Sequence, residues 1–287
     1  MTELLQVMVQ GMLIGSTYGL LALGMGLIFG VMGIVSFAQG DLVSLGMFLC
    51  LALYAGFGLD PYVSVFVTVP LLMISGGAIY WFLIRPIAGQ HLLMVVQLTL
   101  GLSFVIQNGL LMTFGGQAQR VPSVVDSDLL IVRDVVIQMP HVIAAAVSFG
   151  LALGLYAMLG WTDAGRAIRA VSQNSHAAYL MGIKVARVRL VTFAIGCGLV
   201  AIAASLLAPG AVMVPAQGFR YTVIILLTMV LGGMTNFVSI MCGGIVIAMS
   251  EAVGAVYFAD TFGLLLPYLV FVLVMIIRPQ GLTWRTT

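Results

Sequence analysis

The chain of 287 residues has very little charge. Only 7% of its residues are Asp, Glu, Lys or Arg, against about 25% in soluble globular proteins. The hydrophobic fraction is 62% and the mean hydropathy is +1.20. A chain of this composition cannot cover itself with polar surface in water, which excludes a soluble domain. We therefore expect an all-α polytopic membrane protein whose apolar side chains face lipid and each other.

Motifs for nucleotide hydrolysis are also missing. A P-loop reads GxxxxGK[ST], but the single lysine, Lys184, lies in MGIKV, so the chain is not expected to be an ATPase by itself. Neither GxSxG nor HExxH occurs, so a membrane-embedded enzyme has no support in the sequence. The net charge of +2 is too small to indicate binding to nucleic acid.

Metal-binding and redox motifs are absent as well. No two cysteines form a CxxC, and the three histidines lie far apart in sequence, so we expect neither a metal site nor a bound cofactor. The cysteines lie in apolar stretches and are expected to be buried small hydrophobic residues: Cys50, Cys197 and Cys242.

Long windows without charge predict the membrane spans. A helix needs about 20 apolar residues to cross a bilayer, and only helices or closed barrels satisfy their backbone in lipid. The runs lack the period-two alternation of barrel strands, so we assign helices throughout. The predicted spans are 5–28, 41–58, 61–84, 91–115, 139–161, 190–213, 222–233, 238–258 and 262–278. The piece at 222–233 is short and is expected to be a half-helix, which gives eight or nine crossings.

The basic residues predict the orientation. Five of the eleven lie between positions 166 and 189, and two more close the chain. The positive-inside rule then places 162–189 and the tail 279–287 in the cytoplasm. Alternation of the spans places 116–138, which carries three Asp and one Pro, in an outer loop. With nine crossings the N-terminus also lies outside.

Glycine is abundant, with 34 residues. Gly15, Gly19 and the run from Gly24 to Gly33 fit close packing between membrane helices. The same glycines also fit an irregular helix that lines a path, and the sequence does not decide between the two interpretations.

Polar residues at membrane depth mark candidate sites, because an ionisable side chain there costs at least a few kcal/mol. Ser36, Gln39 and Asp41 follow an apolar run with no loop long enough to separate two helices. The cluster indicates a broken or re-entrant helix beside a cavity or interface. The alternative is a tight turn in which Asp41 caps the next helix. Glu251 has no basic neighbour in sequence and is either a hydrogen-bonded structural residue or part of a path.

The segment 162–189 contains two predicted short helices. Thr162 or Asp163 can cap the first, Asn174 can end it, Ser175 can cap the second, and Gly182 can close it. In a loop surrounded by water, the apolar side chains between these capping residues would contribute nothing to stability. They fit either a docking surface for a cytoplasmic partner or an amphipathic loop that rests on lipid headgroups.

Three stretches resemble the permease subunits of the branched-chain amino-acid ABC importers, close to the leucine/isoleucine/valine subtype. The first is 22–41, ALGMGLIFGVMGIVSFAQGD. The second combines GRAIRAVSQN at 165–174 with AAYLMG at 177–182, and the third is RPQGL at 278–282. Their order and spacing match, so the resemblance covers nearly the whole chain.

The resemblance implies a type II ABC importer permease in a bacterial inner membrane. The chain would be a single transmembrane permease domain over 1–287, with a cytoplasmic coupling segment at 162–189 and a periplasmic loop at 116–138. Its partners would be a second permease subunit that is usually unlike it, two ABC ATPase subunits and a periplasmic solute-binding protein. No cofactor is implied, because the ATPase subunits hydrolyse the ATP.

The residues and the resemblance together suggest candidates for both roles. Contact with the ATPases is expected from Arg166, Arg169, Asn174, Ala177, Leu180 and Gly182. The translocation path is expected to include Ser36, Gln39, Asp41, Asn236 and Glu251.

Two departures leave the cargo open. The chain has SFAQGD at 36–41 where the family commonly shows NFAHGE, and GGMTNF at 232–237 where a small Gly/Pro-rich turn is common. The cargo is therefore a branched-chain or other amino acid, or a related amide, urea or organic acid. The other classes that fit the sequence are an ion-coupled secondary transporter and a channel or scaffold that works without ATPases.

Overall fold

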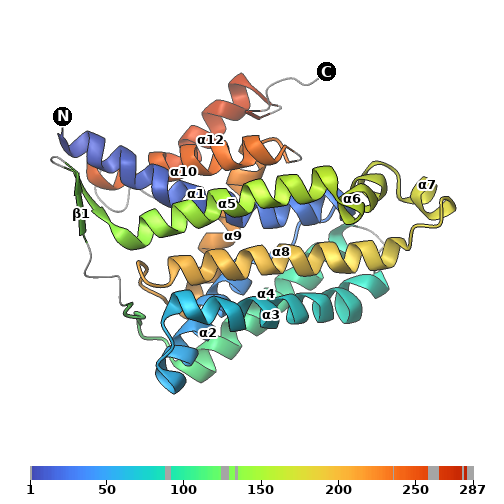
Figure 1. Ribbon diagram of the computed structural model, residues 1–287, viewed down its shortest axis with the longest axis horizontal. Coiled ribbons are helices and arrows are strands. Elements are labelled where there is room, and N and C mark those ends of the chain that lie inside the picture. The colour runs from blue at the N-terminus through green and yellow to red at the C-terminus, as the bar shows by residue number, and fades with distance from the viewer. Residues whose placement is uncertain are drawn as a thin grey trace.

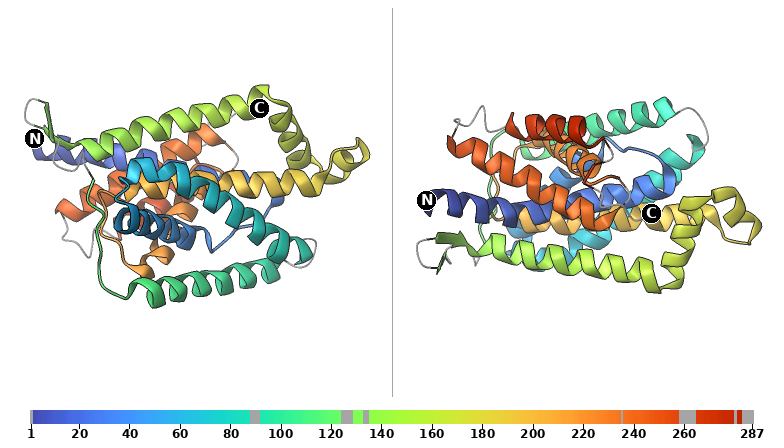
Figure 2. Two further views of the ribbon diagram at one scale, coloured as in Figure 1. Left: turned by 60° about the horizontal axis from the view of Figure 1, so that its bottom comes forward. Right: turned by 90° about the horizontal axis from the view of Figure 1, so that it is seen from above.

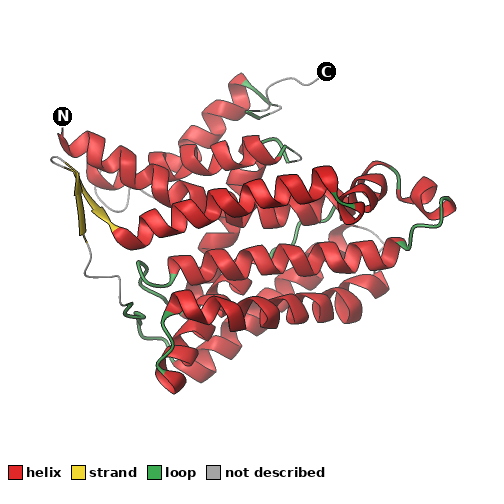
Figure 3. Cartoon of the chain, viewed as in Figure 1, coloured by secondary structure: helices red, strands yellow, loops and turns green. Residues whose placement is uncertain are grey.

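The computed structural model is a bundle of helices with one small hairpin (Figure 1, Figure 3). It describes residues 2–87, 92–123, 129–132, 135–234, 236–257, 265–279 and 281–282. The α-helices are α1 (Thr2–Met32), α2 (Gln39–Phe57), α3 (Pro61–Ala78), α4 (Leu92–Phe114), α5 (Met139–Trp161), α6 (Asp163–Gln173), α7 (Ser175–Leu180), α8 (Val185–Leu207), α9 (Gly218–Leu231), α10 (Phe237–Tyr257) and α12 (Leu266–Ile277). A π-helical turn η1 (Ile79–Ile84) and a 3₁₀ turn η2 (Arg85–Ile87) extend α3, and a 3₁₀ turn η3 (Pro215–Gln217) precedes α9.

Among the described residues, seven helical segments are long and apolar enough to cross a membrane. They contain α1, α2, α3, α4, α5, α8 and α10. The other apolar helices, α9 and α12, have 14 and 12 residues, which is a rise of about 21 and 18 Å against a hydrocarbon core of about 30 Å. The predicted all-α polytopic fold with half-helices is therefore confirmed.

The loop predicted at 116–138 contains an antiparallel hairpin of β1 (Leu129–Val132) and β2 (Val135–Gln138), in which Leu129 pairs with Gln138, and the sequence did not predict this hairpin. One expectation is wrong. Cys50 and Cys197 are buried as predicted, but Cys242 lies exposed on α10 because its position on that helix faces outward.

The centre of the bundle is α1, which packs against α5, α8, α9 and α10. Its glycines make this possible, as the close-packing interpretation predicts. A Cβ on Gly15 would lie 2.5 Å from the Cα of Ile245, and one on Gly24 would lie 2.8 Å from the Gly196 oxygen. Gly30 has open space beside it instead.

The two ends of the bundle differ. The start of α1 and the hairpin lie at one end, and α6 and α7 lie at the other (Figure 1). Figure 2 shows from two further directions that α7 extends beyond the ends of α5 and α8. The start of α1 and the segment 162–189 thus lie at opposite ends of the bundle, and the side of the membrane that each end faces stays a prediction. Of the predicted tail 279–287, residues 280 and 283–287 lie outside the described part of the chain.

Candidate functional site

Helix caps fold the segment between α5 and α8 into two short helices, α6 and α7, which we call the elbow. The Thr162 hydroxyl accepts a bond from the Gly165 N–H at 3.1 Å, which starts α6 as predicted. Asn174 ends α6 and also caps α7, because its Oδ1 accepts from the N–H groups of His176 and Ala177 at 3.0 Å each. The cap predicted at Ser175 therefore lies one residue earlier. Gly182 follows α7 with φ of +83°, the left-handed conformation that closes a helix.

One face of α6 holds the elbow against the bundle. Gly165, Ile168 and Val171 are buried. A Cβ on Gly165 would lie 2.4 Å from the Met158 oxygen, so only glycine lets α6 turn this tightly on the end of α5. Helix α6 also contacts α1 and α8, so the elbow packs directly against the central helix.

The tip of the elbow is apolar and uncovered. Tyr179, Leu180 and Met181 are 68%, 71% and 83% exposed, and we call these three residues the apolar tip. Ala178 is buried beneath them, while the predicted contact residue Ala177 is exposed. Three adjacent exposed apolar side chains on a projecting turn are typical of a surface that contacts a protein partner or a membrane.

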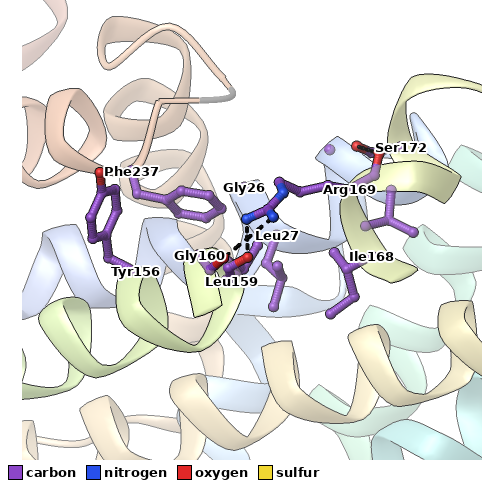
Figure 4. A pocket seen from close by; sticks show the side chains of 11 residues that line it. Gly26, Leu27, Tyr156, Leu159, Gly160, Ile168, Arg169, Ser172 and Phe237 are labelled. Carbon is purple, nitrogen blue, oxygen red and sulfur yellow. Dashed lines mark hydrogen bonds between the residues drawn. The ribbon is translucent and has the colours of Figure 1, made fainter. Parts of the chain in front are cut away.

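The two predicted arginine contacts differ. Arg166 is exposed and pairs with the exposed Asp163 one turn earlier, so its side chain is accessible to a partner. Arg169 is also exposed, but it donates to the Leu159 and Gly160 carbonyls at the end of α5 (Figure 4). A cation at a helix C-terminus is stabilised there by the unpaired carbonyls, so Arg169 fastens α6 to α5.

A cavity of about 340 Å³ lies beside Arg169 (Figure 4). Its walls come from α1, α5, α6 and the start of α10, and include Gly30, Tyr156, Ser172 and Phe237. The cavity lies at the elbow end of the bundle, where α6 would need room to move against α1.

A second set of predicted residues meets at a break in the chain. Helix α1 ends at Met32, and α2 begins at Gln39 inside the bundle against the start of α9. The Gly40 N–H donates to the Thr222 hydroxyl at 3.1 Å, and that hydroxyl donates to the Phe37 carbonyl at 2.9 Å. The approach is so close that a Cβ on Gly40 would lie 2.2 Å from the Gly218 oxygen. The break thus holds two helix N-termini together.

Asp41 lies buried at this junction of α2 and α9. Its carboxylate accepts a bond from the Ser103 hydroxyl of α4 and touches the backbone of Gly218. A carboxylate beside helix N-termini is stabilised by their unpaired N–H groups. Ser36 and Gln39 are buried beside it, and the described residues offer the Gln39 amide no hydrogen-bond partner. The structure therefore brings three of the five predicted path residues together.

The other two path residues lie apart. Glu251 of α10 forms an ion pair with Arg220 of α9. Asn236 instead caps α10, since its Oδ1 accepts from the Val238 N–H at 3.2 Å, and it lies at the elbow end of that helix. The sequence interpretation missed Arg220, although it stands alone between two charge-free windows just as Glu251 does.

A bundle of apolar helices whose broken helices meet at a buried polar junction defines a polytopic membrane transport protein. A sequence model of the family described as "branched-chain amino acid transport system / permease component" matches residues 7–276. The chain belongs to this family.

Curated relatives of nearly equal length support the assignment. The chain is 29% identical to the high-affinity branched-chain amino acid transport system permease protein BraD of Pseudomonas aeruginosa, over 98% of this chain and 96% of that protein. It is 26% identical to LivH of Escherichia coli K12 over the same shares, and 28% identical to a probable LivH of Methanocaldococcus jannaschii over 92% of this chain and 87% of that protein. No solved structure matches the chain.

Proposed function

We propose that the chain forms half of the translocation path of a binding-protein-dependent ABC importer for branched-chain amino acids. The relatives BraD and LivH carry that cargo in their names, and the chain aligns with almost all of each. A second permease subunit forms the other half, and a solute-binding protein delivers cargo on the side of the hairpin. The location is the bacterial inner membrane, with the elbow in the cytoplasm.

The apolar tip carries the proposal. Helix α7 packs against its neighbours α6 and α8, and the side chains of the apolar tip are exposed and available to a partner. Separate ATPase subunits would receive the tip and move it when they bind ATP. This division of labour fits a sequence without a P-loop.

The elbow can transmit such a movement to the path. Arg169 and Gly165 tie α6 to the end of α5, and α6 also touches α1. The cavity beside Arg169 leaves room for the displacement. Because α1 continues through the break into α2, a shift of α1 changes the junction at Asp41, and alternating access follows from that change.

The test replaces Leu180 by aspartate in the complete transporter. A charge in the centre of an apolar contact should cost at least about 1.4 kcal/mol, which lowers ATPase affinity about tenfold. Leu180→Met, which keeps the apolar surface, is the matched control. The measurements are co-purification with the ATPase subunits and ATP-driven uptake in vesicles.

We expect the aspartate variant to insert in normal amounts, to lose its ATPases and to import poorly, while the methionine variant behaves as wild type. An aspartate variant that keeps its ATPases and imports normally would show that the elbow does not couple.

A further inference from the structure

The ion pair of Arg220 and Glu251 lies at membrane depth. Glu251 follows Phe237 by fourteen residues and precedes Tyr257 by six, so it lies about 21 Å from one end of α10 and about 9 Å from the other. A charged side chain this deep costs at least about 2.5 kcal/mol in contact with lipid. The pair must therefore face water or protein.

The described chain leaves one side of this pair open. The Arg220 side chain is 44% exposed and that of Glu251 is 18% exposed. Buried Tyr18 lies behind Glu251, close enough to interact with it. A void of about 20 Å³, room for about one water molecule, adjoins both charged groups. The open side is thus the side on which a polar molecule could approach.

A short helix begins at the pair. Pro267 and Tyr268, the second and third residues of α12, line the same void as Arg220. Arg220 itself is the sixth residue of the continuous helix Pro215–Leu231, in which η3 runs directly into α9. At 12 residues α12 is too short to cross the membrane alone. Unpaired N–H groups at the start of a helix favour a negative charge, and membrane transporters use half-helix N-termini to hold the carboxylate of a substrate.

We propose that Arg220 and Glu251 form a polar binding site on the translocation path for the head group of a zwitterionic amino acid. The carboxylate of the cargo binds Arg220 and the start of α12, and its ammonium binds Glu251. The ion pair opens as the cargo enters and closes behind it. Because each charged group exchanges one partner for another, the cargo is held weakly enough to leave.

The signs of the two charges select the class of cargo, which deepens the proposed function and depends on it. Glu251 would repel the carboxylate of an organic acid, and a neutral amide or urea would leave both charged groups without an opposite charge. An α-amino acid satisfies both groups at once. Ile224 and Leu227 give the void an apolar wall beside the two charges.

The test uses the complete transporter in proteoliposomes with its binding protein. Removing one charge alone would strand the other, so the informative variant is the double replacement Arg220→Gln with Glu251→Gln, which keeps shape and polarity. A second variant exchanges the charges, Arg220→Glu with Glu251→Arg. Uptake of radioactive leucine and ATP hydrolysis are measured on the same vesicles, with wild type beside them.

We expect the neutral double variant to assemble and hydrolyse ATP while leucine uptake falls at least about tenfold. The exchanged variant should not recover uptake, because the start of α12 still favours the carboxylate. Normal uptake by the neutral variant, or recovery of uptake in the exchanged variant, would show that the ion pair only stabilises the fold. If wild type itself shows no ATP-driven uptake, the proposed function fails rather than this inference.

A labelling measurement covers the case in which the double variant does not fold. Leu227→Cys, which lines the void and keeps both charges, with the exposed Cys242 replaced by alanine, should react with a charged, membrane-impermeant thiol reagent, and excess leucine should slow the reaction. Ile276→Cys on the exposed face of α12 is the control and should react slowly if that face meets lipid. Equal slow reaction at both positions would contradict a water-accessible path at Glu251.

Discussion

The contact between α2 and α9 predicts a sharp effect of one methyl group. Gly40→Ala would place a Cβ 2.2 Å from both the Gly218 oxygen and the Thr222 nitrogen. Real Cβ contacts do not fall below 3.0 Å, so the helices must separate by about 0.8 Å or more. Overpacking of this kind costs about 1–3 kcal/mol. The shift also stretches the bond from Gly40 to Thr222, which is worth about 1 kcal/mol.

Thermal unfolding of the purified permease and uptake by the complete transporter measure this effect. We expect Gly40→Ala to unfold at a lower temperature and to import less, because the junction at Asp41 is displaced. Gly56→Ala is the control, since Gly56 lies in the same helix with nothing within 4 Å of its added Cβ. Equal stability and uptake of the two variants would refute the packing of the two helix N-termini.

Three further substitutions test other parts of the account. Gly244→Ala would place a Cβ 2.4 Å from the Gly19 nitrogen and should lower the free energy of unfolding by about 1–3 kcal/mol. Gly109→Ala is the control, because its added Cβ meets open space and should have little effect. Equal unfolding temperatures of the two variants would contradict this packing. Asn174→Ala removes the cap of α7 at a cost of about 1 kcal/mol and should reduce ATP-driven uptake at normal expression. Asn174→Ser keeps a capping side chain and should retain uptake. Unchanged uptake in the alanine variant would mean that the cap does not matter for coupling. Asp41→Asn should insert normally and import poorly, and full uptake would reduce Asp41 to a helix cap.

Much of the fold was predictable because the membrane limits the choices. A chain in lipid must satisfy its own backbone, so a charge-free window of sufficient length becomes a helix, and the span predicted at 139–161 coincides with α5. The caps of the elbow were equally readable, since Thr162, Asn174 and Gly182 act through local geometry. The hairpin was missed because four-residue strands leave a weak signal inside a polar loop.

The site was predictable only in part. Ser36, Gln39 and Asp41 are adjacent in sequence, and their burial follows from one break in the chain. The partner of Asp41 on α4 lies 62 residues away, and that of the adjacent Gly40 on α9 lies 182 residues away. Sequence alone does not give such contacts. The pairing of Arg220 with Glu251 across 31 residues was missed for the same reason.

The central claim is that energy enters the bundle through the apolar tip, and labelling of Tyr179→Cys tests it most directly. Cys50 and Cys197 are buried, so only the exposed Cys242 needs replacement by alanine. In inside-out membrane vesicles a membrane-impermeant thiol reagent should label this variant, and added ATPase subunits should block the label. Labelling from the opposite face of the membrane, or labelling that the ATPases leave unchanged, would contradict the account.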